Sequence, residues 1–149
     1  TDETVNNKVK AAQAAGLKPI MCVGETLEER EAGKASDIIS GQVRAGLEGI
    51  TDTSGLIVAY EPIWAIGTGR SATPETAAEI MGGAILETLR SLFPASADNI
   101  SLLYGGSMNA GNAGDYAAQS CIHGGLVGGA ALQAESFLQV AAAIAAAKD

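Results

Sequence analysis

One carboxylate, Glu61, stands at the end of the most apolar stretch of the sequence. Residues 56–60 before it are hydrophobic, and Pro62 and Ile63 follow it at once. Such surroundings partly withdraw a carboxylate from water and suit it to accept a proton from a substrate near neutral pH. We therefore expect Glu61 to act as a general base at the carboxyl end of a strand.

The segment that follows Glu61 combines apolar side chains with glycine. Residues 63–66 are Ile, Trp, Ala and Ile, with Pro62 before them and a Gly-Thr-Gly sequence at 67–69 after them. A loop of this kind can close over a site and exclude water, with hinges at the proline and the glycines. The same composition is also typical of a rigid apolar turn packed on its neighbours, so composition alone leaves both interpretations open.

Two glycine-rich turns follow later apolar runs of the chain. Gly105-Gly106-Ser107 offers backbone N–H groups and one hydroxyl, and Gly128-Gly129 precedes a turn. Backbone N–H groups in such loops and at helix N-termini bind phosphate. Either turn alone is also typical of a tight strand-to-helix connection, whereas two of them after consecutive strands favour an anion site. Neither turn contains a basic side chain.

The elements that must position these loops alternate along the chain. Apolar periodicity and end signals predict helices at 1–15, 27–47, 73–92, 110–118 and 135–147, and strands at 19–23, 56–61, 100–104 and 124–127. One helix followed by four strand–helix units indicates an α/β protein with a parallel sheet. Short strands with a loop of Gly and polar residues at each carboxyl end favour half of a (βα)8 barrel over a doubly wound sheet. A complete barrel needs about 250 residues.

Several details of these elements are predicted as well. Asp2 is expected to be the N-cap of the first helix. Gly33 and Gly41 weaken the helix at 27–47, which is then two pieces. The strand at 19–23 is expected to be buried on both faces, and the alanine-rich last helix is expected to be buried.

Composition and charge exclude several classes of protein. The 149 residues are predicted to form a single domain, 1–149, with 9 Lys and Arg against 17 Asp and Glu and a net charge of −8. That balance argues against nucleic-acid binding and against a polybasic membrane-surface protein. No run of about 18 apolar residues and no signal-peptide pattern is visible. Cys22 and Cys121 are expected to be buried free thiols in a reducing, cytoplasmic compartment, and their spacing is not that of a metal site.

Four segments together resemble the triosephosphate isomerase family. They are CVGETLEER at 22–30, YEPIWAIGTG at 60–69, YGGS at 104–107 and LVGGA at 126–130. They follow the family's order and spacing over essentially the whole chain, and the ten residues from Tyr60 are very specific. The resemblance implies the C-terminal half of a TIM barrel, strands five to eight. It also implies an isomerase of glycolysis and gluconeogenesis that interconverts dihydroxyacetone phosphate and glyceraldehyde 3-phosphate, with no metal or other cofactor.

The resemblance also assigns roles to residues of this sequence. Glu61 would move the proton between two carbons of the triose phosphate, and Tyr104 would latch the closed lid. Glu25 and Tyr60 would be alternative hydrogen-bond partners of Trp64. The lid would consist of Pro62, Ile63, Trp64, Ala65, Ile66, Gly67 and Thr68, and the phosphate would be held by Gly67, Ser107, Gly128 and Gly129.

The family's other catalytic groups would precede Thr1, since its substrate-binding Asn and Lys follow its first strand and its electrophilic His follows its fourth. His123 is the only histidine here. At about 3.3 Å per residue it lies roughly 16 Å from Gly128, too far for proton transfer. The family usually has an Asp there, paired with an Arg where this chain has Ile85. Loss of both argues against the family's usual anchoring of the last strand and leaves the chemistry at Glu61 unaffected.

Half a barrel leaves two strand edges and an apolar inner face uncovered. The expected partner is a missing N-terminal half-barrel or a second copy of the chain, as a homodimer. The expected ligand is a small phosphorylated triose, phosphate or sulfate. With the first partner the chain is part of an enzyme and is inactive, or nearly so, alone. With the second it is a catalytically inactive, self-assembling half-barrel with a residual phosphate site. A third interpretation, another phosphate-binding barrel isomerase, is disfavoured by the lid sequence.

Overall fold

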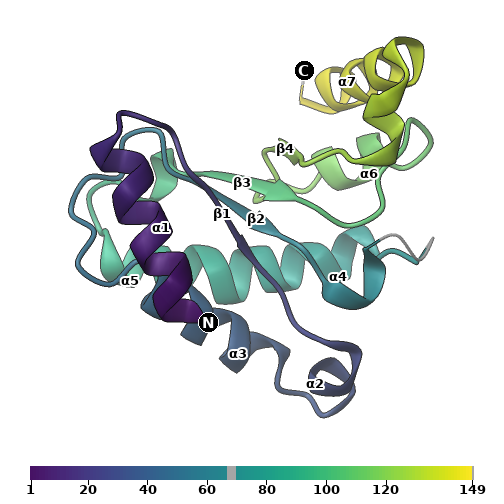
Figure 1. Ribbon diagram of the computed structural model, residues 1–149. Helices are drawn as coiled ribbons and strands as arrows, with labels where there is room; N and C mark the ends of the chain where they lie inside the picture. The colour runs from purple at the N-terminus through teal and green to yellow at the C-terminus, as the bar shows by residue number, and fades with distance from the viewer. Residues whose placement is uncertain (67–69, 149) are drawn as a thin grey trace.

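The computed structural model describes residues 1–66 and 70–148, in which helices pack around a four-stranded sheet (Figure 1). The strands are β1 (Ile20–Val23), β2 (Ile57–Tyr60), β3 (Ser101–Tyr104) and β4 (Gly124–Gly125). The helices are α1 (Asp2–Ala14), α2 (Leu27–Glu31), α3 (Ala35–Gly46), α4 (Pro74–Ala78), α5 (Glu87–Leu92), α6 (Ala113–Ala117) and α7 (Ala134–Lys148). Three 3₁₀ turns, η1 (Ile63–Ala65), η3 (Ala97–Asn99) and η4 (Gly129–Leu132), and a π-helical segment, η2 (Glu79–Leu86), complete these elements.

The strands pair in parallel and in sequence order, β1-β2-β3-β4. Right-handed crossovers place the connecting helices on one face as long as the sheet is wound in one direction. A doubly wound sheet reverses direction and carries helices on both faces. Figure 1 shows α3, α4 and α5 on the same side of the sheet. The observed order therefore confirms the predicted segment of a (βα) barrel.

The main hydrophobic core lies between the sheet and the connecting helices. Met21, Val58 and Leu102 form one row across three strands and are at most 2% exposed. Ile39 of α3 and Ile85 of η2 are fully buried in the same core. Each large aliphatic side chain contributes roughly 1.5–3 kcal/mol when buried, so this layer holds the strands in register.

The opposite, inner face of the sheet is largely open. Ile20 is 44% exposed, Cys22 is also exposed, and Leu103 is only partly buried. The prediction that the strand at 19–23 is buried on both faces is therefore wrong for its inner face. In a complete barrel the side chains of other strands would cover that face, and four strands do not provide them.

Glycine divides the predicted helix at 27–47 into α2 and α3, as expected. Gly33 has a φ of +71°, a left-handed conformation that ends a helix. Gly41 lies within α3 without interrupting it. The predicted helix at 73–92 runs through α4, η2 and α5, and Thr73 is its N-cap.

The two terminal helices differ from the predictions. Thr1 is the N-cap of α1 in place of Asp2, because the Thr1 hydroxyl accepts a hydrogen bond from the Thr4 N–H at 3.3 Å. Among the described residues of α7, only Val140 is buried, and Leu138 is 67% exposed, so the prediction of a buried last helix is wrong. Figure 1 shows α1 near β1 and α7 beyond β4, at opposite ends of the sheet.

Within the described part of the chain, no helix has the length and apolar character needed to cross a bilayer.

Candidate active site

Glu61 projects from the end of β2 between two glycine backbones. The Glu61 N–H donates to the Val23 carbonyl at 2.8 Å, and the Gly105 N–H donates to the Tyr60 carbonyl at 2.7 Å. This register places Gly24 on one side of Glu61 and Gly105 on the other. A Cβ atom on Gly24 would lie 1.8 Å from the Glu61 carbonyl oxygen, and one on Gly105 would lie 2.4 Å from Glu61 Cγ. A side chain at either position would displace Glu61, so the two glycines form a slot that positions the carboxylate.

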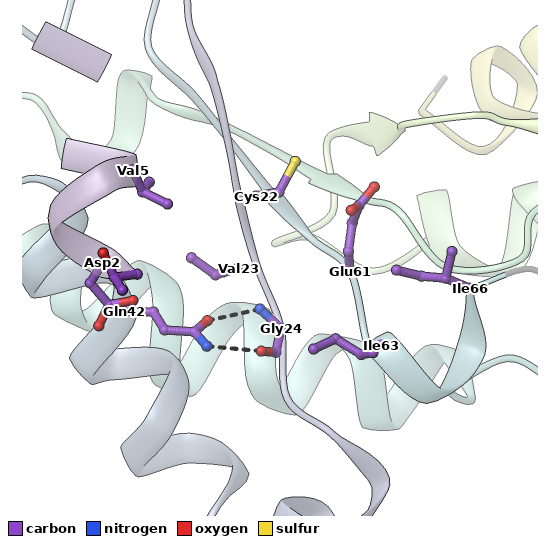
Figure 2. Close-up of a pocket in the computed structure, with 10 residues that line it drawn as sticks. Asp2, Val5, Cys22, Val23, Gly24, Gln42, Glu61, Ile63 and Ile66 are labelled. Atoms are coloured by element: carbon purple, nitrogen blue, oxygen red, sulfur yellow. Dashed lines mark hydrogen bonds between the residues drawn. The ribbon is translucent and has the colours of Figure 1, made fainter. Parts of the chain in front are cut away.

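The Glu61 side chain borders a pocket of about 280 Å³ at the carboxyl end of β1, and this pocket extends to Asp2 and Val5 of α1 (Figure 2). The lining includes Cys22, Gly24, Gln42, Ile63 and Ile66. Partial desolvation, the negative charge of Glu61 and a hydrogen bond to Glu61 all raise the pKa of the Cys22 thiol. The thiol therefore stays protonated near neutral pH and can donate to the carboxylate.

Glu25 is a fully buried carboxylate that holds the start of the lid segment. Its Oε1 accepts hydrogen bonds from Trp64 Nε1 at 2.9 Å, from the Tyr60 hydroxyl at 3.1 Å and from Arg30 at 3.1 Å. The Arg30 guanidinium also lies 5.4 Å from the centroid of the Trp64 ring. Charge and hydrogen bonds thus compensate one oxygen of the buried carboxylate, Oε1, whereas Oε2 is buried without a hydrogen-bond partner among the described residues. The structure joins Trp64 with both of its predicted partners in one network, with the direct bond going to Glu25.

The predicted lid begins with the 3₁₀ turn η1. The Ile63 N–H donates to the Glu25 carbonyl at 3.0 Å, and the Ala65 N–H donates to the Pro62 carbonyl at 2.8 Å. Ala65 is buried, whereas Ile63 and Ile66 are 53% and 48% exposed.

The lid residues Gly67 and Thr68 lie outside the described residues, so the movement of the lid stays a prediction.

Tyr104, the predicted latch, binds the chain shortly after the lid. Its hydroxyl accepts a hydrogen bond from the Ala72 N–H at 3.1 Å, and the Tyr116 hydroxyl donates to the Ala72 carbonyl. The Tyr104 and Tyr116 rings stack with centroids 4.2 Å apart. A Cβ atom on Gly106 would lie 2.2 Å from the Tyr104 hydroxyl oxygen, so Gly106 leaves room for this ring.

A second pocket, of about 350 Å³, lies among the glycine-rich loops. Its lining includes Ile66, Gly106, Ser107, Gly128 and Gly129. The Ser107 hydroxyl donates to the Ala65 carbonyl at 3.1 Å and so connects this pocket to the lid segment. Among residues 1–66 and 70–148, the backbone N–H groups of Ser107, Gly128 and Gly129 donate no hydrogen bond. Three of the four predicted phosphate-binding residues therefore meet in one pocket, and the fourth, Gly67, lies outside the described residues.

Comparison with known proteins decides the family. The family model of triosephosphate isomerase matches residues 1–144. The chain belongs to the triosephosphate isomerase family. It is 53% identical over 144 residues to the triosephosphate isomerase of Xanthobacter autotrophicus and 52% identical over 149 residues to that of Paracidovorax citrulli. These matches cover 96% and 97% of the chain but 56% and 57% of the relatives. The chain therefore spans about half the length of the curated relatives that it matches.

A triosephosphate isomerase from Endomicrobium trichonymphae gives the same result, with 50% identity over 94% of the chain and 56% of the relative. The predicted family and barrel fold are confirmed by these matches. The roles of individual residues in the triosephosphate isomerase reaction stay predictions.

His123 is not part of either pocket lining and anchors β4 to β3. The main-chain N–H of His123 donates to the Leu102 carbonyl at 2.9 Å, and the imidazole Nδ1 of His123 accepts from the main-chain N–H of Leu102 at 2.9 Å. Burial and the nearby Lys148 lower the pKa of His123, which favours the neutral imidazole that can accept this bond. Ile85 is fully buried in the hydrophobic core. A histidine–backbone pair and an apolar contact are thus found at the two positions where the family resemblance predicts an ion pair.

Two contacts at the site are missed by the sequence analysis. Gln42 of α3 bonds to both main-chain groups of Gly24, and Cys22 faces Glu61 instead of the core. Gln42 interrupts the apolar helix face that includes Ile39 and Val43. A polar side chain in that position needs a hydrogen-bond partner, which is the one signal that the sequence offers for it.

Proposed function

We propose that the chain is the C-terminal half of a triosephosphate isomerase, which interconverts dihydroxyacetone phosphate and glyceraldehyde 3-phosphate by proton transfer. One observation carries this proposal: the Glu61 pocket and the glycine-rich pocket share the lid residue Ile66. A three-carbon phosphate beneath Ile66 would have its reacting carbons near Glu61. Its phosphate would then lie against the N–H groups of Ser107, Gly128 and Gly129.

The residues of the two pockets suit this reaction. Glu61 would accept a proton from the carbon beside the carbonyl group and return it to the adjacent carbon. The slot between Gly24 and Gly105 orients the base, and orientation contributes several powers of ten to a rate. Backbone N–H dipoles bind phosphate without a lysine, despite the net charge of −8. The exposed side chains of Ile63 and Ile66 would exclude water when the lid closes.

The proposal also assigns part of the reaction to a missing half. Among the described residues, no histidine or lysine lines either pocket. The family resemblance places the electrophilic His and the substrate-binding Lys in units before Thr1. We infer that activity requires the N-terminal half-barrel and that the chain alone is inactive or nearly so. A homodimeric enzyme, a role in glycolysis and gluconeogenesis, and a cytoplasmic location are proposed on the same resemblance.

Titration of dihydroxyacetone phosphate into the isotopically labelled chain, followed by amide chemical shifts, tests the proposal. We expect shifts at Ser107, Gly128 and Gly129 with millimolar affinity, about −4 kcal/mol, because the net charge opposes anions. Inorganic phosphate should move the same amides, whereas unphosphorylated dihydroxyacetone, the control, should not. If neither dihydroxyacetone phosphate nor inorganic phosphate shifts the amides of these residues, the assignment of the phosphate site is contradicted.

A second candidate function is a self-assembling half-barrel without catalysis. The exposure of Ile20 and Cys22 on the inner face favours it, because this surface needs a cover. Two copies related by a two-fold axis along the barrel would pair β1 of one with β4 of the other at both seams. Such an assembly would contain two Glu61 carboxylates, and it would still lack the His and Lys of the family. Turnover and solution mass together distinguish the two functions.

A further inference from the structure

Gln42 connects the outer helix layer to the end of strand β1. It lies within α3 and is partly buried. Its Nε2 donates to the Gly24 carbonyl at 2.9 Å, and its Oε1 accepts from the Gly24 N–H at 2.9 Å (Figure 2). A carboxamide carries a donor and an acceptor side by side, so it can pair with both main-chain groups of one residue. Gln42 thus takes the place of a neighbouring strand at the first residue after β1.

Gly24 in turn lies against the backbone of Glu61. The bond from the Glu61 N–H to the Val23 carbonyl, 2.8 Å, and the bond from the Ile63 N–H to the Glu25 carbonyl, 3.0 Å, tie the two segments together on either side of Gly24. A Cβ atom at Gly24 would overlap the Glu61 carbonyl oxygen. The backbones are therefore in close contact, and a displacement of Gly24 is transmitted to Glu61.

The two walls of the Glu61 slot are held in different ways. Gly105 is fixed by a main-chain bond to Tyr60 of the adjoining strand. Both main-chain polar groups of Gly24 are instead bonded to the Gln42 side chain. A single side-chain substitution can therefore loosen one wall of the slot while the other wall keeps its sheet hydrogen bond.

We propose that Gln42 is a positioning residue for the general base: by clamping Gly24, it fixes the place of the Glu61 carboxylate in the pocket. The inference rests on the proposed function of Glu61 and adds a residue that acts through Gly24. A merely structural role would fasten α3 to β1 and leave the surroundings of the carboxylate unchanged. The two roles differ in what happens beside Glu61 when the clamp is removed.

Cys22 reports on the position of Glu61 without any catalysis. Its thiol pKa is raised by desolvation and, in addition, by the charge of Glu61 and a hydrogen bond to it. If Glu61 leaves its slot, the last two contributions weaken and the thiol pKa falls. Because the thiolate is the reacting species, the fall is measured as faster alkylation at a pH below the titration midpoint.

The experiment measures the pH dependence of alkylation of the whole chain by iodoacetamide, with Cys22 and Cys121 resolved by peptide mass spectrometry. Gln42→Met keeps the length of the side chain and removes both bonds to Gly24. It should lower the Cys22 midpoint in the same direction as Glu61→Gln, with alkylation about twofold faster or more at about pH 8. Cys121, the internal reference, should keep its midpoint.

A matched control is Gln13→Met. It also removes a hydrogen bond from a glutamine to the main chain, that of Gln13 Nε2 to the Asp52 carbonyl at 2.8 Å, outside the pocket lining. This variant should leave the alkylation midpoints of both Cys22 and Cys121 at their wild-type values. Gln42→Asn, which keeps the amide on a shorter side chain, is the second clamp variant. It should lower the Cys22 alkylation midpoint, as Gln42→Met should. It serves as the test if circular dichroism shows that Gln42→Met folds poorly.

A Cys22 midpoint that stays at the wild-type value in a folded clamp variant, while Glu61→Gln lowers it, would overturn the positioning role. The proposed function would survive that result, because it is judged by ligand binding and turnover. Conversely, a lowered Cys22 midpoint in a chain that binds no phosphate would support the clamp and count against the isomerase assignment.

Discussion

Close approaches to glycine determine the geometry around Glu61 and Tyr104. Gly105 leaves room for the Glu61 side chain and Gly106 leaves room for the Tyr104 ring, since a Cβ atom on either would collide with these groups. The sequence predicts both glycines as donors to phosphate, because glycine-rich turns are typical anion sites. Composition cannot distinguish a glycine that binds an anion from one that admits a side chain. Only the register of the sheet, which pairs residues distant in sequence, makes that distinction.

His123 should make the stability of the chain sensitive to acid. Its pKa is lowered in the folded chain by burial and by Lys148, so the unfolded chain takes up the proton first as the pH falls. The bond from Leu102 to Nδ1 therefore contributes fully above the unfolded pKa of about 6.5 and is lost as the pH falls through the lowered folded value. His123→Asn offers an acceptor that does not titrate.

Urea unfolding of wild type and His123→Asn between about pH 7.5 and pH 5 measures this effect. The wild type should lose stability relative to the variant as the pH falls, by an amount in the range of one hydrogen bond, about 1 kcal/mol. A difference in the free energy of unfolding that does not change with pH would contradict the proposed titration of His123.

The elements of the chain were predicted more reliably than their burial. Apolar periodicity and caps such as Thr73 place the helices and strands within a few residues of their observed bounds. The prediction that the inner face of β1 and the helix α7 are buried is wrong, although both have the composition of covered elements. The composition of a helix or strand indicates whether it is suited to being buried. It does not indicate whether this chain contains the residues that would bury it. The clamp by Gln42 was missed for a related reason, since it joins a helix to a loop 18 residues away.

Two glycines of the α2–α3 region should respond oppositely to alanine. Gly41 lies inside α3, and Gly33 lies between the helices with a φ of +71°, while a Cβ atom at either has nothing within 4 Å. Gly41→Ala should raise the free energy of unfolding by about 0.5–1 kcal/mol, because alanine favours a helix. Gly33→Ala, the matched control, should lower it because of its left-handed backbone. Thermal unfolding of both variants measures these changes. If both substitutions change the free energy of unfolding in the same direction, the conformational explanation is contradicted.

At the scale of the whole molecule, the sheet formed by the described residues ends in β1 on one side and β4 on the other, with exposed apolar side chains near each edge. Leu17 and Ile20 are 64% and 44% exposed beside β1, and Leu132 and Leu138 are 82% and 67% exposed beyond β4. Burial contributes roughly 25 cal/mol per Å², so an interface of about 2,000 Å² would offset the entropy of association. In the absence of an N-terminal half, we expect the chain to associate with a second copy.

Sedimentation at micromolar concentration measures this association. The expected mass is above the 15.0 kDa of one chain. Leu138→Lys should weaken the association, whereas Ser36→Lys, an exposed position on the outer helix α3, should not. A stable, folded monomer would show that the open edges do not drive pairing.

Isomerase turnover, measured for the chain alone and after addition of the N-terminal half of a curated relative, tests the proposed division of the active site most directly. The chain alone should show no conversion of dihydroxyacetone phosphate above that of Glu61→Gln. The completed barrel should be active, and Glu61→Gln should lower its turnover by about 10²-fold or more. Glu75→Gln, at an exposed carboxylate, should leave that turnover unchanged. A turnover of about 10 s⁻¹ by the isolated chain that disappears in Glu61→Gln would contradict the need for the other half. Full turnover of the completed barrel with Glu61→Gln would contradict the role of Glu61 as the base.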